Sequence, residues 1–183
     1  MATGSRHPSP PSSYVTNPAL KSYDISVADY LSQNPCYRHG GIFSAAVIIY
    51  QGRVLLIQRA SDDEFPDIWE VPGGTASQDE TIIDCVVREL WEETGLRASA
   101  VERLTGEYEC EINLTKWKIF IFLVVVDNDQ MGDSDKIVLD PQEHQAFLWA
   151  TRQEIEDNRC GEAQLGWFSL EQKGAILTAL RVY

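Results

Sequence analysis

Three glutamates near the end of one predicted helix are the residues whose types and spacing most clearly indicate chemistry. Glu89, Glu92 and Glu93 fall on one face of this helix, beside its apolar stripe. The helix dipole is negative at that end and disfavours carboxylates there, and Glu89 and Glu93 form a repulsive i, i+4 pair. A divalent cation bound between them would remove these costs, because Mg²⁺ prefers clustered carboxylate oxygens. The spacing alone also fits an ordinary solvated acidic face.

The residues around these glutamates form a long spaced motif. It runs from Gly74 through five residues to Glu80, through seven more to Arg88-Glu89-Leu90, and after Trp91 it continues as Glu92-Glu93-Thr94-Gly95-Leu96. This motif resembles the Nudix box, G-x5-E-x7-R-E-U-x-E-E-x-G-U with U aliphatic, at every specified position. A match of this length is far more specific than a short glycine motif. The resemblance covers residues 40–155 and implies an α/β fold, a mixed β-sheet sandwiched between helices (α/β/α).

The resemblance also implies an activity and a metal. Nudix hydrolases cleave a nucleoside diphosphate linked to another moiety and use Mg²⁺ or Mn²⁺. By motif position Glu89, Glu92 and Glu93 would ligate the metal, with the backbone carbonyl of Gly73 as a further ligand. Bound metal lowers the pKa of a water that attacks phosphorus, so no Ser or Cys nucleophile is required. The expected protein is a pyrophosphatase acting on a small-molecule nucleotide; the alternative is a catalytically silent nucleotide-binding sensor with the same fold.

The residue that accepts the proton of the attacking water has two candidates. Glu89 serves in some branches of the family, and a glutamate on a later loop serves in others. Glu143 occupies such a place in this sequence, so it is a candidate base or extra metal ligand, with an ordinary loop carboxylate as the alternative. The adjacent His144 is expected to be structural or solvent-facing.

The other candidate residues have positioning or binding roles. The remaining residues of the box are expected to shape the loop and the helix rather than contact metal: Gly74, Glu80, Arg88 and Gly95. Arg59 either contacts substrate phosphate or pairs with a nearby carboxylate. Trp69 and Trp117 either stack on a base or belong to the core.

The residues that separate branches of the family do not identify the leaving group. ADP-ribose hydrolases tend to carry a Pro a short distance beyond the box, and dinucleoside-polyphosphate hydrolases a Tyr. The first Pro after the box is Pro141, far downstream, and Tyr108 lies too early. The sequence therefore supports neither assignment.

Composition limits the partners of this chain. Its 183 residues carry a net charge of −13, which argues against binding a nucleic-acid polymer or an anionic membrane surface. A polyanionic substrate would be repelled unless cations were bound, in agreement with a metal site. The longest apolar run, 119–126, is too short to span a bilayer, and the four cysteines form no C-x-x-C pair. A reduced, cytoplasmic protein is expected, as a monomer or homodimer.

The elements that must position these residues follow from the patterning of the chain. Strands are expected over 43–50, 53–59, 108–115 and 119–126. The helix with the glutamates is expected over 79–94, opened by a capping box of Ser77 and Glu80 and ended by Gly95 in the left-handed conformation. Further helices are expected after Ser26, Thr151 and Ser169. Residues 1–20, rich in Pro and Ser, are expected to be a disordered tail, and 21–183 a single domain.

Overall fold

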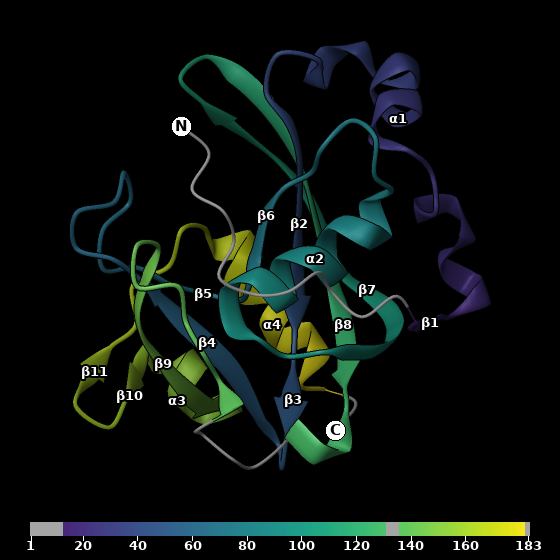
Figure 1. The fold of residues 1–183 in the computed structure, drawn as a ribbon. Helices are drawn as coiled ribbons and strands as arrows, with labels where there is room; N and C mark the ends of the chain where they lie inside the picture. Colours follow the sequence, from purple (N-terminus) through teal and green to yellow (C-terminus); the bar gives the residue numbers. More distant parts are fainter. Residues whose placement is uncertain (1–12, 131–135, 182–183) are drawn as a thin grey trace.

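A mixed sheet forms the centre of the molecule (Figure 1). The computed structural model describes residues 13–130 and 136–181. Strands β2 (Gly41–Val47) and β8 (Thr115–Val126) pair in parallel, and β7 (Ala98–Ile112) runs antiparallel to β8. The short strands β1 (Val15–Thr16) and β6 (Gly73–Thr75) complete the order β1-β7-β8-β2-β6.

A second sheet is built around β4 (Arg53–Arg59), which pairs with three other strands: β3 (Ile49–Tyr50), β5 (Trp69–Glu70) and β9 (His144–Thr151). The single strand expected over 43–50 is therefore divided between the two sheets. The pairing of β4 with β9 shifts register between Gln58 and Arg59. Such an irregularity redirects a side chain, and here it lies where Arg59 and His144 face each other.

Helices cover both faces of the central sheet. Side chains alternate along a strand, and Ala46 and Phe120 pack toward α2 (Ile82–Thr94) on one face. Ala45 and Ile121 pack toward α4 (Leu170–Ala179) on the other, together with Ile155 of α3 (Arg152–Glu156). Figure 1 shows α2 in front of the sheet and α4 behind it. This arrangement confirms the expected α/β/α fold.

The glutamate-bearing helix begins later than expected. Its N-cap is Thr81, which forms a reciprocal capping box with Asp84, and Gly95 ends it with a φ of 70°. Glu80 still accepts a hydrogen bond from the Ser77 amide, but the segment between them is a turn that precedes the helix. The helix was expected to begin at residue 79 but begins at Ile82. The expectation was wrong because two capping sequences follow one another here, and the second one caps the helix.

The chain is ordered before the expected domain boundary. Residues 13–20 were expected to be disordered, yet Val15 and Thr16 pair with β7 and Leu20 is 3% exposed. The segment then forms η1 (Pro18–Tyr23), α1 (Val27–Gln33) and η2 (Pro35–Tyr37). The remainder of the predicted tail, residues 1–12, lies outside the described residues.

The N-terminal segment packs onto the central sheet. Tyr23 contacts Phe120 and Phe122 edge-on, with ring centroids 5.5 and 5.6 Å apart. Val27 and Leu31 of α1 are buried in the same core cluster as α2. The segment is therefore part of the hydrophobic core.

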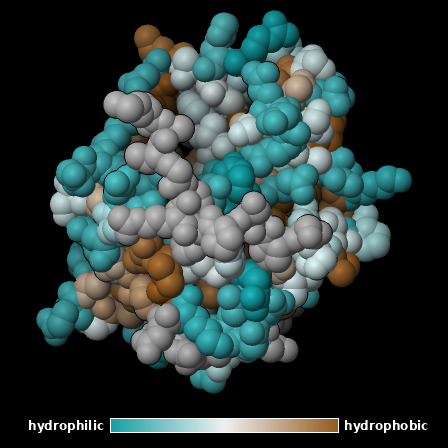
Figure 2. All heavy atoms as spheres, in the orientation of Figure 1, coloured by the Kyte–Doolittle hydropathy of each residue, from teal (hydrophilic) through white to brown (hydrophobic). Residues whose placement is uncertain are grey.

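Three short elements complete the described part of the fold: η3 (Asn128–Gln130), and the strands β10 (Arg159–Cys160) and β11 (Ala163–Gln164), which form a hairpin. Strand β7 begins ten residues before the strand expected from residue 108, because its register shifts between 98 and 106 break the alternation of apolar residues. Figure 2 shows mostly hydrophilic residues on the visible face, as the acidic composition suggests. Among the described residues, no helix is long and apolar enough to cross a membrane.

Candidate functional site

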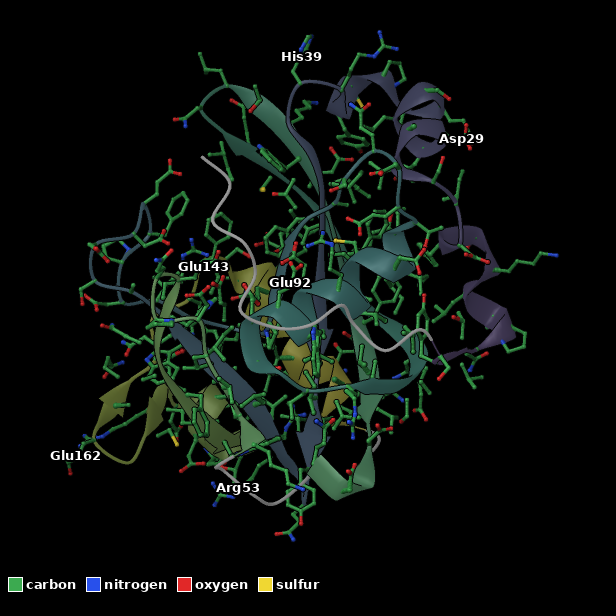
Figure 3. All side chains as sticks on the ribbon, in the orientation of Figure 1. Asp29, His39, Arg53, Glu92, Glu143 and Glu162 are labelled. Atoms are coloured by element: carbon green, nitrogen blue, oxygen red, sulfur yellow. The ribbon has the colours of Figure 1, made fainter. Side chains whose placement is uncertain are left out.

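The three glutamates of α2 lie at different depths. The side chain of Glu92 is 36% exposed, that of Glu89 is 13% exposed, and that of Glu93 is 6% exposed. The face that they form is therefore not a simple solvated surface, since two of the three carboxylates are largely removed from water. Figure 3 shows Glu92 on α2 and Glu143 on the loop before β9, on the same side of the molecule.

Arg88 connects the carboxylates of this region. Its guanidinium binds both carboxylate oxygens of Glu80, at 2.9 and 2.7 Å. It also donates to Glu89 at 2.7 Å and to Glu92 at 2.8 Å. Two glutamates of α2 are thus held by a cation of the same helix, and Glu80 fixes that cation from the preceding turn. This geometry agrees with positioning roles for Glu80 and Arg88.

The two adjacent glycines of β6 allow α2 to approach closely. The Gly73 amide donates to Glu93 Oε2 at 2.7 Å. A side chain at Gly74 would overlap the carboxylate of Glu89. Both glutamates therefore lie against the backbone of β6, and a side chain at Gly74 would displace Glu89.

Burial changes the proton affinity of the carboxylates. Removal from water raises the pKa of Glu89 to about 7, although Arg88 opposes the shift. Burial, together with repulsion from Glu89 and Glu70, raises the pKa of Glu93 well above its usual value, and the Gly73 amide offsets only part of this. Excess negative charge in a poorly hydrated place is what a bound divalent cation would neutralise, so the donor set fits such an ion.

Glu143, on the loop before β9, and His144, the first residue of β9, add two groups to the site. Glu93, Glu143 and His144 each offer one ligand atom, and these atoms lie within 4.8 Å of one another. His144 is 1% exposed, with Nε2 3.4 Å from Glu70 and 3.8 Å from Glu93. The expected solvent-facing alternative for His144 is therefore wrong. Glu143 is exposed at the edge of the group.

Arg59 lies at the site but is already paired. It binds both oxygens of Asp63 at 2.7 Å and Glu70 at 2.9 Å. Glu70 in turn approaches His144. The structure thus shows the carboxylate pairing that the sequence left open.

A pocket of about 310 Å³ opens beside Arg59 and Glu70, between the β7–β8 hairpin, the loop after β4 and the start of α4. Its walls include five aromatic residues: Phe43, Phe65, Tyr108, Trp117 and Phe168. Polar groups from Asn113, Thr115 and Gln172 also line it. Of the two tryptophans considered as stacking residues, Trp117 faces this pocket, whereas Trp69 is 4% exposed in the core.

Sequence reasoning missed most of this pocket. Its residues come from strands, loops and a helix that are distant in the chain, so no local spacing reveals them. One available signal was the alternation of Tyr108, Cys110 and Ile112 along β7, which places one face of the hairpin over the pocket.

Comparison with known proteins finds a matching family model and relatives whose names describe related activities. The sequence model of the NUDIX domain matches residues 42–172. A "MutT-like protein" of Streptomyces ambofaciens is 42% identical over 71 residues, which are 39% of this chain and 43% of that protein. The "CTP pyrophosphohydrolase" of Escherichia coli K12 is 31% identical over 119 residues, covering 60% of this chain and 75% of that protein.

Solved structures share the fold. The NUDIX hydrolase from Nitrosomonas europaea superposes with a TM-score of 0.59 and 26% identity, covering 75% of this chain and 86% of that one. The alignment with the Streptomyces relative spans less than half of that relative's length.

Proposed function

The chain belongs to the NUDIX domain family, and from this premise we propose that it is a Mg²⁺- or Mn²⁺-dependent hydrolase of the diphosphate bond in a nucleoside diphosphate linked to another moiety. One observation carries the proposal. Glu93 of α2 converges with Glu143 and His144, and Glu70, which approaches His144, lines a pocket with aromatic walls. A site of this kind can hold the charged and the planar parts of a nucleotide at once.

The metal ligands in this proposal are Glu89, Glu92 and Glu93, with the Gly73 carbonyl as a further ligand. The ion, when bound, would neutralise the diphosphate and lower the pKa of a water. Arg88 holds Glu89 and Glu92 in place, and the Gly73 amide holds Glu93. These contacts reduce the conformational freedom that the ligands would lose on binding.

The proton of the attacking water would pass to Glu89 or to Glu143. Glu89 is a largely buried carboxylate of the proposed metal site, which makes it one candidate base. Glu143 is exposed, and its carboxylate lies within 4.8 Å of ligand atoms of Glu93 and His144. Because Glu89 is also a proposed metal ligand, Glu143→Gln separates the two: this variant loses turnover while still binding nucleotide if Glu143 is the base, and keeps turnover if Glu89 is.

The substrate in this proposal is a small-molecule nucleotide. One relative is named as a CTP pyrophosphohydrolase and another, from Haemophilus influenzae, as a dihydroneopterin triphosphate diphosphatase. Both names describe diphosphate chemistry on a planar heterocycle, which matches the pocket with aromatic walls next to carboxylates. We also propose a cytoplasmic location, on the grounds of the sequence.

The experiment that tests the proposal is a hydrolysis assay with identified products. Purified protein with Mg²⁺ or Mn²⁺ is incubated with nucleoside triphosphates, nucleotide sugars and dinucleoside polyphosphates. We expect a phosphate-bearing product from at least one of them, and loss of turnover by more than about 100-fold in Glu92→Gln.

The matched control is Glu162→Gln, on the exposed turn between β10 and β11, where the side chain points away from the site (Figure 3). This variant should retain full turnover. Nucleotide binding without any product would instead indicate a silent sensor. Equal turnover in Glu92→Gln and the control would contradict the metal site.

A further inference from the structure

The floor of the pocket is one face of the central sheet. Tyr108 of β7 is paired with Ile119 of β8, which is paired on its other side with Phe43 of β2. One pair further along, Cys110 lies opposite Trp117. All five side chains line the pocket, because residues two apart along a strand face the same side. The floor is therefore largely aromatic.

The walls of the pocket come from the loop after β4 and from the start of α4. Phe65 of the loop meets Phe168, which precedes the helix, edge-on with ring centroids 5.1 Å apart. The ring of Trp117 packs against Gly41, where a Cβ would lie 3.4 Å from it. The pocket thus presents several aromatic rings that are held in place by their neighbours. Such surfaces stack on planar heterocycles.

The charged side chains that line the pocket are mostly acidic. They are Arg59, Glu64 and Glu70. Arg59 is neutralised by Asp63 and Glu70, at 2.7 and 2.9 Å. Glu64 is exposed, and within the described parts of the chain its carboxylate has neither a hydrogen bond nor an ion pair. An unpaired negative charge therefore remains at the pocket.

The acidic groups also act on the phenol and the thiol of the floor. Burial raises the pKa of Tyr108 to about 12, although a hydrogen bond with Ser169 opposes the shift. The charges of Glu171 and Glu70 act in the same direction as burial. Burial and the charge of Glu171 raise the pKa of Cys110 as well. A negative charge on the floor is thus disfavoured, and a positive charge would be favoured by the same carboxylates.

The pocket reaches the carboxylate site through Glu70. Its Oε1 lies 3.4 Å from Nε2 of His144, and the same nitrogen lies 3.8 Å from Oε1 of Glu93. Thr75, which also lines the pocket, belongs to β6 together with Gly73, whose amide binds Glu93. A ligand with a planar group in the pocket can therefore carry a diphosphate to the proposed metal site.

We propose that the pocket binds a positively charged heteroaromatic ring, an N-alkylated base or a pyridinium, with the aromatic side chains stacking on the ring and Glu64 pairing with its charge. This inference rests on the proposed hydrolase function and specifies its substrate class. A ring cation gains a cation–π attraction from aromatic faces in addition to stacking. Its neutral counterpart gains only the stacking and leaves Glu64 unpaired. The site should therefore discriminate by charge between rings of nearly the same shape.

The test compares ring cations with their neutral counterparts. We measure kcat/KM with Mg²⁺ for N7-methyl-GTP against GTP, where the base carries the charge, and for NAD⁺ against NADH, where the ring of the linked moiety carries it. The wild-type protein should favour the charged member of at least one pair about fivefold or more. The favoured pair identifies which end of the substrate enters the pocket, and the absence of a preference in both pairs overturns the inference.

Glu64→Gln keeps the shape of the side chain and removes its charge. Because Glu64 is exposed, this variant should fold normally and lose about 2- to 5-fold of the preference. The preference of the wild-type protein should also fall as KCl is raised, since salt screens exposed charges. Asp62→Asn, exposed on the same loop but outside the pocket lining, is the matched control and should keep the preference. An unchanged preference in Glu64→Gln overturns the inference.

Binding without metal separates this inference from the proposed function. Isothermal titration calorimetry compares N7-methyl-GMP with GMP, and nicotinamide mononucleotide with its reduced form. If no nucleotide is hydrolysed but the charged member of a pair binds more tightly in a Glu64-dependent way, the hydrolase proposal fails and this inference stands. If nucleotides are hydrolysed without regard to the charge of the ring, this inference fails and the hydrolase proposal stands. Equal binding of both members without hydrolysis overturns both.

Discussion

Gly73 and Gly74 are adjacent in the chain but have different neighbours, so the same substitution should affect them differently. The three atoms nearest to a Cβ at Gly74 would all belong to the carboxylate of Glu89, the far end of a flexible side chain. Gly74→Ala should therefore fold with nearly normal stability and lose activity about 10- to 100-fold, since Glu89 is displaced. The check is kcat with Mg²⁺ beside a urea unfolding curve.

Gly73→Ala is the matched comparison. A Cβ there would lie 2.5 Å from the Ala45 Cβ and 2.6 Å from the Ser44 carbonyl oxygen, both on the neighbouring strand. Because backbone cannot move aside easily, we expect a loss of about 1–3 kcal/mol in the free energy of unfolding. Equal stability of the two variants would contradict this account of the glycines.

Some residues of the candidate site could be predicted from the sequence and others could not. The carboxylates of α2 were found from spacing, because a helix places residues three and four apart on one face. The pairing of Arg59 and the burial of His144 depend on strands that are remote in sequence, β4, β5 and β9. The sequence predicts Gln172 only as the partner of Ser169 in a helix cap, and the missing partner of its Oε1 is visible only once its surroundings are known.

At the scale of elements, the N-terminal segment braces the turn that precedes α2. Its amides at Val27 and Ala28 donate to the carbonyls of Glu80 and Gln78, at 2.9 and 3.1 Å. The hydroxyl of Tyr14 donates to Asp84 at 2.6 Å. Since Glu80 fixes Arg88, which holds two glutamates, the brace bears indirectly on the carboxylate site.

Ala28→Pro tests this connection. Residue 28 is exposed in the first turn of α1, where proline is tolerated, but proline has no amide to donate to Gln78. We expect kcat to fall about tenfold with a Tm close to that of the wild type. Gln153→Pro, at the same position of α3, should leave kcat unchanged. A wild-type kcat in Ala28→Pro would show that the turn before α2 keeps its conformation without the hydrogen bond from residue 28.

The elements that sequence patterning misplaced share a physical cause. Thr81 rather than Ser77 caps α2, because both have cap-forming neighbours and only tertiary contacts choose between them. Residues 45–49 are continuously apolar, so the division of the segment 43–50 between two sheets leaves no trace in hydrophobicity. Residues 13–20 look disordered by composition, but pairing with β7 orders them.

At the scale of the whole molecule, buried negative charge should make stability depend on metal. Glu93 is nearly inaccessible and lies near two other carboxylates, Glu89 and Glu70. Mn²⁺ or Mg²⁺ should raise the Tm, by an amount corresponding to about 2.7 kcal/mol at a hundred times Kd. Glu93→Gln should abolish most of that rise without lowering the Tm of the metal-free protein. A metal-induced shift of the same size in both proteins would argue against Glu93 as a ligand.

The pairing of Val15 and Thr16 with β7 has a consequence for how the molecule can be shortened. A chain starting at residue 42, where the family match begins, would lack this strand and leave one side of β7 open. Unpaired strand borders recruit other chains, and Phe120 would lose its covering tyrosines. We expect light scattering to show that such a fragment self-associates and that a chain starting at residue 13 does not. The segment that folds as one body therefore begins before residue 42, where the family match begins.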